Sequence, residues 1–197
     1  MEDSKVLQIV EAARKRFAHF GLAKTTMNEI AADIGMSKAS LYYYFPDKER
    51  LFLAVVDQEL GQFEAVVNDI ISRPSKASFK LKKYVTTRNE FLKSLLNLAK
   101  LENISVSQMS NPAYDDVKKT FHQKDKLLVG QILTNGIQQQ EFRNIKVDQH
   151  AEVFIAALIG IRYVNLSGAF SMTPDGYETM HLQSLLFVDL FLRSIRS

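Results

Sequence analysis

The sequence predicts an all-α protein in which an N-terminal three-helix unit, with a helix-turn-helix, is joined to a larger C-terminal helical domain. Two observations support this fold class. Apolar residues recur at intervals of three and four along most of the chain, which is the period of helices with one buried face. The C-terminal half shows no alternating β-branched runs, so no strand is predicted there. We place the N-terminal unit at residues 1–46 and the C-terminal domain at residues 47–197, with a connecting helix at 47–73.

The N-terminal unit begins with an amphipathic helix at about residues 4–20, which a glycine ends. Thr26 and Glu29 then have the spacing of a capping box, in which each side chain bonds the backbone N–H of the other residue. This pattern predicts the start of a second helix. Gly35 ends that helix because glycine adopts the left-handed conformation at least cost, and Ser37 can cap a third helix.

The third helix has an exposed face of small and aromatic side chains. Helical spacing turns Leu41, Tyr44 and Phe45 inward, which leaves the other side of the helix facing solvent. Small side chains allow close approach, and polar groups at a helix N-terminus suit phosphates and base edges. Lys48, in the first turn of the next helix, offers a second anion contact. The exposed candidates on the third helix are Ser37, Lys38, Ala39, Ser40, Tyr42 and Tyr43.

The run TTMNEIAADIGMSKASLYYYFPDKERL, residues 25–51, is specific in its Leu-Tyr and Tyr-Phe pairs and in its Lys-Glu ending two residues before leucine. On these residues the chain resembles, over about residues 5–55, the DNA-binding domain of the tetracycline-repressor (TetR) family of bacterial transcription regulators. The helix-turn-helix pattern alone leaves open an ordinary helical hairpin with surface tyrosines. The resemblance implies backbone contacts to DNA from Thr26, Ser37, Tyr42, Tyr43 and Lys48, and an approach to base edges by Lys38, Ala39 and Ser40.

Composition excludes several classes of function. The 197 residues carry a net charge of +3 and no cysteine, so disulfides, thiolate nucleophiles and cysteine-ligated zinc are excluded. The sequence has no nucleotide-binding, metalloprotease or hydrolase motif, and we therefore expect neither an enzyme nor a cofactor or metal ion. The start of the chain lacks the bases of a signal peptide, and its longest apolar run, residues 153–161, is too short to span a bilayer. We expect a cytoplasmic protein with no membrane partner.

The C-terminal domain is predicted to contain helices at about residues 77–98, 101–110, 112–140, 148–170 and 174–196, with Asp148 as the cap of the fourth. In the fourth, small residues form a row that another helix could approach closely. The last helix is apolar over most of its circumference, which indicates an interface or simple burial within one chain. The resemblance also implies a homodimer built on these two helices. The predicted interface residues are Val153, Ala157, Gly160, Val164, Gly168, Val188 and Phe191.

Two arginines lie on apolar helical rows of this domain. Arg88 and Arg162 each need a partner, and Asp125 lies on a third apolar row. One interpretation is a buried salt bridge to Asp125, Glu102 or Glu152. The other is a ligand cavity in which the cations bind a carboxylate or phosphate beside aromatic walls. The candidate effector residues are Tyr84, Arg88, Phe91, Tyr114, Phe121, Asp125 and Arg162.

These patterns and the resemblance lead to one preferred function. We expect a ligand-responsive transcriptional repressor that binds a double-stranded DNA operator as a homodimer and is released by a small-molecule effector of unknown identity. The alternative is a DNA-bound adaptor controlled by a protein partner, with no small-molecule ligand.

Overall fold

The computed structural model describes residues 2–99, 112–165 and 173–197, and within these ranges it contains helices and no strand. The predicted all-α class is confirmed. The predicted helix at residues 101–110 lies outside the described residues. The observed helices are α1 (Glu2–Phe20), α2 (Met27–Asp33), α3 (Lys38–Tyr44), α4 (Lys48–Ser72), α5 (Ala77–Ala99), α6 (Pro112–Gln138), α7 (Val147–Val164) and α8 (Pro174–Ile195).

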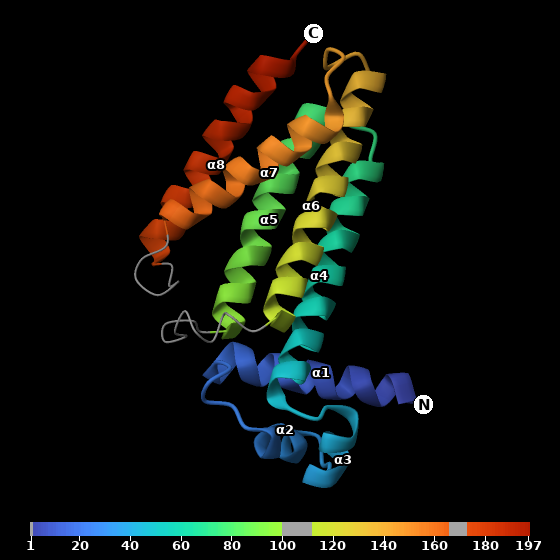
Figure 1. Cartoon of the computed structure of the whole chain (residues 1–197), viewed down its shortest axis with the longest axis vertical. Coiled ribbons are helices and arrows are strands. Elements are labelled where there is room, and N and C mark those ends of the chain that lie inside the picture. The colour runs from blue at the N-terminus through green and yellow to red at the C-terminus, as the bar shows by residue number, and fades with distance from the viewer. Residues whose placement is uncertain (1, 100–111, 166–172) are drawn as a thin grey trace.

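The helices are arranged in two groups along the long axis of the molecule (Figure 1). Helices α1 to α3 form one end, and α4 rises from them beside α5 and α6, while α7 and α8 lie on one side of these three. The buried apolar residues also divide into two clusters. An N-terminal cluster extends from Ile9 to Val56, and a C-terminal cluster extends from Leu60 to Ile195. The division between the clusters therefore falls inside α4, which belongs to both groups.

Side-chain caps explain where the two short helices, α2 and α3, begin. The Thr26 hydroxyl and the Glu29 side chain form the predicted capping box of α2. The Ser37 hydroxyl accepts a hydrogen bond from the backbone N–H of Ser40 at 3.1 Å and caps α3. Gly35, with φ of 64°, follows the end of α2 in the left-handed conformation that favours glycine.

The predicted cap of α7 is wrong. The helix begins at Val147 after Lys146, which makes no side-chain cap hydrogen bond. Asp148 lies inside the first turn, where its carboxylate accepts a hydrogen bond from the Lys126 ammonium of α6 at 3.2 Å. Val147, the first residue of α7, packs against the C-terminal cluster, so a tertiary contact lies where the helix begins. In the described part of the chain no helix is long and apolar enough to cross a membrane.

The connection between α6 and α7 closes over Gly136. A Cβ atom added at this glycine would meet the ring of Phe142 and would lie 2.9 Å from the Cβ of Ala77. Phe142 is buried, and its neighbour Arg143 donates its backbone N–H to the carbonyl of Ile195 at 3.0 Å. Absence of a side chain at position 136 therefore allows α5, the α6–α7 connection and the end of α8 to meet.

We expect Gly136→Ala to lower the free energy of unfolding by about 1–3 kcal/mol, because the added methyl group overpacks this junction. Urea denaturation followed by circular dichroism measures the change. Gly61→Ala is the matched control, since Gly61 lies inside α4 with no atom within 4 Å of an added Cβ. The control should gain up to about 1 kcal/mol from helix propensity. Equal stability of the two variants would show that Phe142 moves aside freely.

Candidate nucleic-acid interface and buried charged cluster

Helix α3 lies at the end of the molecule formed by α1 to α3 (Figure 1). Most of its polar and aromatic residues are exposed to solvent. Leu41 is fully buried and anchors the helix on the N-terminal cluster, against which Tyr44 and Phe45 also pack. Tyr42 and Tyr43, by contrast, are 40% and 77% exposed. The predicted inward and outward faces of this helix are confirmed.

The polar side chains at the start of α3 contact one another. The hydroxyls of Ser37 and Ser40 lie 2.8 Å apart, and the Lys38 ammonium lies 5.7 Å from the centre of the Tyr42 ring. Residues 37 to 40 are all exposed. Ala39 adds little bulk between them, so two hydroxyls, one ammonium group and one aromatic ring are exposed together.

Thr26 is the exposed N-cap residue of α2 and forms the capping box with Glu29. Its hydroxyl donates to the Glu29 carboxylate at 2.8 Å. At the other end of α2, Arg16 of α1 donates to the Asp33 carboxylate at 2.8 Å, and this ion pair holds α2 against α1. Hydrogen bonds with Thr26 lower the pKa of Glu29, so the capping carboxylate stays ionised.

Lys48 has a role that the sequence did not reveal. Its ammonium group donates to the backbone carbonyls of Leu22 at 2.8 Å and Thr25 at 2.9 Å. The side chain therefore ties the start of α4 to the loop between α1 and α2, and one of its three N–H groups remains for another acceptor. A backbone carbonyl has no signature in the sequence, which is why this contact could not be predicted.

Three of the candidate effector residues form a buried cluster between α5 and α6. The Tyr84 hydroxyl donates to one carboxylate oxygen of Asp125 at 2.6 Å, and Arg88 Nε donates to the other at 2.7 Å. All three residues are at least 99% buried. The interpretation of Arg88 and Asp125 as a buried salt bridge is confirmed.

Burial sets the protonation of this cluster. It raises the pKa of the Tyr84 hydroxyl well above its usual value, and the Asp125 carboxylate raises it further, so Tyr84 remains a donor. Burial by itself lowers the pKa of Arg88, but the charge of Asp125 and the hydrogen bonds within the cluster oppose this, and the pKa is raised overall. The Arg88 guanidinium also lies 5.4 Å from the centre of the Phe121 ring, which in turn packs against Phe91.

Arg162, on α7, lies close enough to this cluster to interact with its charges. Burial lowers the pKa of Arg162, and the positive charge of Arg88 lowers it further. Among the described residues, Arg162 Nε and Arg88 Nη1 are buried nitrogens with no hydrogen-bond partner. Glu152, one of the predicted partners, instead contacts His122 at 3.0 Å and Lys126 at 3.3 Å. Glu102 and the side chain of Tyr114 lie outside the described residues.

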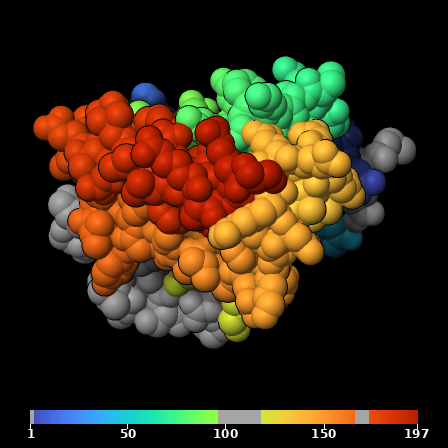
Figure 2. Space-filling model, turned by 90° about the horizontal axis from the view of Figure 1, so that it is seen from above, coloured from blue at the N-terminus to red at the C-terminus, as the bar shows by residue number. Residues whose placement is uncertain are grey.

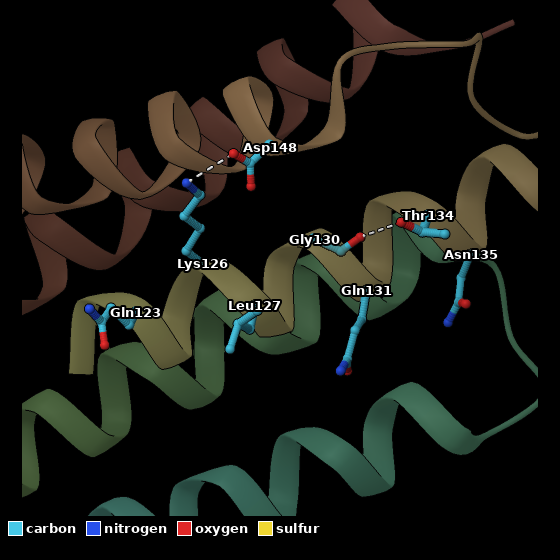
Figure 3. A pocket seen from close by; sticks show the side chains of 8 residues that line it. All are labelled: Gln123, Lys126, Leu127, Gly130, Gln131, Thr134, Asn135 and Asp148. Carbon is cyan, nitrogen blue, oxygen red and sulfur yellow. Dashed lines mark hydrogen bonds and ion pairs between the residues drawn. The ribbon is translucent and has the colours of Figure 1, made fainter. Parts of the chain in front are cut away.

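A separate groove of about 630 Å³ lies along α6 beside the start of α7 (Figure 3). Its polar side chains include Lys126 and Asp148, which bond each other, and Thr134, whose hydroxyl donates to the carbonyl of Gly130 at 2.8 Å. None of the candidate effector residues lines it. The lining residues are Gln123, Lys126, Leu127, Gly130, Gln131, Thr134, Asn135 and Asp148.

Comparison with known proteins identifies the family of the chain. Residues 9–55 match the bacterial regulatory proteins of the tetR family. A transcriptional regulator from Cytophaga hutchinsonii is 39% identical, and its crystal structure matches with a TM-score of 0.91 over 98% of this chain and 99% of that one. The chain belongs to the TetR family. The resemblance predicted from residues 25–51 is thereby confirmed.

Other relatives agree with this assignment. The transcriptional repressor AcnR of Corynebacterium diphtheriae is 28% identical over 200 residues, which cover 96% of this chain and 90% of that protein. A transcriptional regulator from Saccharomonospora viridis, solved in complex with choline, shares the fold with a TM-score of 0.69 and 18% identity over 99% of both chains. The TetR-family chain is a DNA-binding transcriptional regulator and not an enzyme, as its sequence predicted.

The exposure of residues on α7 and α8 shows which of the predicted interface residues lie at the surface of this TetR-family chain. On α7, Val153 and Val164 are 63% and 75% exposed and Gly160 is also exposed, while Ala157 is half-buried and Gly168 lies outside the described residues. Figure 2 shows α8 at the molecular surface next to α7. Both helices therefore have surfaces that a second copy could reach.

Two of the predicted interface residues are wrong. Val188 is fully buried and Phe191 is 9% exposed within one chain, where the Phe191 ring lies 4.9 Å from that of Phe154. These two residues belong to the stripe of α8 that covers the C-terminal cluster. The opposite stripe of α8 is exposed to solvent. It carries a leucine at every fourth position: Leu182, Leu186 and Leu190.

Proposed function

We propose that this TetR-family regulator is a repressor that binds operator DNA as a homodimer and is released when a small molecule binds its C-terminal domain. The observation that carries the proposal is the exposed face of α3, with Lys38, Ser40 and Tyr42 at the surface and Leu41 anchored beneath them. A short helix held in this way can enter a major groove without unfolding. The named repressor function of AcnR and the choline bound to the Saccharomonospora regulator support the repressor and ligand parts of the proposal.

Within this proposal the residues of the helix-turn-helix have two roles. Thr26, Ser37, Tyr42, Tyr43 and Lys48 position the protein on the sugar-phosphate backbone. Lys38, Ala39 and Ser40 approach the base edges, since they lie at the N-terminal end of α3. The small side chain of Ala39 supports a close approach of α3 to the groove.

The dimer in this proposal is formed by α7 and α8 of two copies. The exposed stripe of α8 consists of Leu182, Leu186 and Leu190, and the neighbouring helix α7 also exposes Val153 and Val164. Apolar side chains of this size on adjacent helices are typical of an interface rather than of scattered surface residues. The two copies of α3 would then meet half-sites about one helical turn, ~10 bp, or a multiple of this apart.

The proposed division at residues 1–46 and 47–197 requires a connection that transmits ligand binding to α3. Helix α5 supplies one in addition to α4, because Leu95 packs against both apolar clusters. Arg88 lies two turns earlier on the same helix, and α5 also packs against α1. A shift of α5 at Arg88 would therefore reach the three-helix unit directly.

DNase footprinting on DNA from around the protein's own coding sequence tests the proposal. We expect a protected, near-palindromic site with two half-sites in register on the duplex. A single unpaired half-site would contradict the dimer, and absence of any protected site with competitor DNA present would contradict the repressor.

Lys48→Ala and Lys38→Ala should affect DNA binding differently. We expect Lys48→Ala to weaken specific and nonspecific binding alike and to lower the salt slope by about one, because it removes a phosphate contact. Lys38→Ala, and likewise Ser40→Ala, should change which base is preferred. Fluorescence anisotropy titrations over a range of salt concentrations measure both effects. An unchanged salt slope for Lys48→Ala would limit Lys48 to its bonds with Leu22 and Thr25.

A further inference from the structure

The cluster around Arg88 has more positive than negative charge. Arg88 and Arg162 interact with each other and with a single carboxylate, that of Asp125. Tyr84 adds no negative charge, since its hydroxyl is held protonated. Within the described residues the cluster therefore carries one positive charge without a counter-charge.

Two donor nitrogens of this cluster are also without acceptors. Arg88 Nη1 and Arg162 Nε are both buried and unpaired in the described part of the chain, and Arg88 is 1% exposed. Buried donors in proteins almost always have a hydrogen-bond partner. Two buried donors without acceptors, next to an excess positive charge, therefore indicate that a group is missing. The missing group must accept hydrogen bonds and carry negative charge.

The acids near the cluster whose contacts the structure describes do not supply that group. Glu152 on α7 is engaged by His122 and Lys126, and Glu64 on α4 is engaged by Lys124 at 3.0 Å. Asp125 already uses one oxygen for Tyr84 and the other for Arg88. Within the described part of the chain the charge and the two donors are therefore unmatched, and a molecule from outside the chain could match both.

We propose that Arg88 and Arg162 together bind the carboxylate of the effector, an inference that rests on the proposed ligand-responsive function. One carboxylate has two oxygens for the two unpaired donor nitrogens and a charge of −1 that balances the cluster. A phosphate monoester carries about −1.5 to −2 at neutral pH and would leave an excess of negative charge. Arg88 is held in position for this role by its bond to Asp125, whereas Arg162 has no such partner among the described residues.

The test uses sodium acetate as the carboxylate probe and measures the melting temperature of the full chain by circular dichroism. Ionic strength is held constant with sodium chloride as the reference salt. We expect acetate to raise the melting temperature of the wild-type protein, by about 3–6 °C at tenfold excess over its Kd. Inorganic phosphate is the second probe and should have a smaller effect.

Variants assign the effect to the cluster. Arg162→Gln should abolish the acetate-dependent shift, and Arg162→Lys, which keeps the charge, should retain part of it. Arg143→Gln is the matched control, because it removes one exposed positive charge from the same domain and should respond to acetate as the wild type does. An equal response of Arg162→Gln and wild type would overturn the proposal, as would a wild-type response to phosphate alone.

Operator binding of the wild-type protein is measured separately by gel shift. If wild type binds no DNA but acetate acts through Arg162, the repressor proposal fails while the carboxylate site stands. If wild type binds its operator and acetate acts equally on all variants, the carboxylate site fails while the repressor proposal stands.

Discussion

Arg88→Met is expected to lower the free energy of unfolding by about 3–5 kcal/mol, the largest effect on stability that we expect from a single substitution here. The substitution removes the cation from a carboxylate that has no exposure to water. Asp125 would keep the Tyr84 hydroxyl at 2.6 Å but would lose the 2.7 Å bond from Arg88. A buried carboxylate that loses its hydrogen-bonded cation costs more than the salt bridge itself contributes, and Arg162, which interacts with Asp125 but donates no hydrogen bond to it among the described residues, would offset the desolvation only in part.

The double variant Arg88→Met/Asp125→Leu separates these two contributions. Replacement of both charges by apolar groups should restore only part of the lost stability, because Asp125→Leu also removes the acceptor of the buried Tyr84 hydroxyl and the carboxylate that interacts with Arg162. Urea denaturation at neutral pH measures all the variants. Lys82→Met is the matched control on the same helix, because it breaks an exposed ion pair with Asp189 and should have little effect. A double variant as unstable as Arg88→Met would show that packing, and not the unpaired charge, accounts for the loss.

Leu186→Glu is expected to convert the proposed dimer to monomers and to lower operator affinity by about 10²–10⁴-fold. Leu186 is 60% exposed at the middle of the outer stripe of α8, so a glutamate there leaves the single chain intact but places a charge between two copies. Two linked half-site contacts then become independent, and their shared effective concentration is lost. Helical circular dichroism should be unchanged.

Sedimentation velocity and a gel shift on the same samples measure this result. Gly160→Leu should act in the same direction, since an added Cβ meets no atom within 4 Å inside one chain. Leu127→Glu is the control, because it changes a leucine that is 67% exposed on α6, outside the proposed interface. A Leu186→Glu protein that still sediments as a dimer would place the interface elsewhere.

Sequence alone determined the features that depend on contacts between near neighbours. The capping box of Thr26 and Glu29, the Ser37 cap and the turn at Gly35 involve bonds within a few residues, so residue type and spacing were enough to predict them. The inward and outward faces of α3 followed from helical period in the same way. The family followed from the same stretch, since its specific residues lie within residues 25–51.

Only the tertiary structure decided which helix faces meet. Arg88 and Asp125 are 37 residues apart, and the sequence could not choose among the possible acids because the choice depends on how α5 packs on α6. The buried stripe of α8 was mistaken for its outer one for the same reason, since both stripes are apolar and periodicity does not say which of them covers the core. Lys48 bonds to backbone carbonyls, which every residue carries, so nothing in its sequence neighbourhood marks the partner.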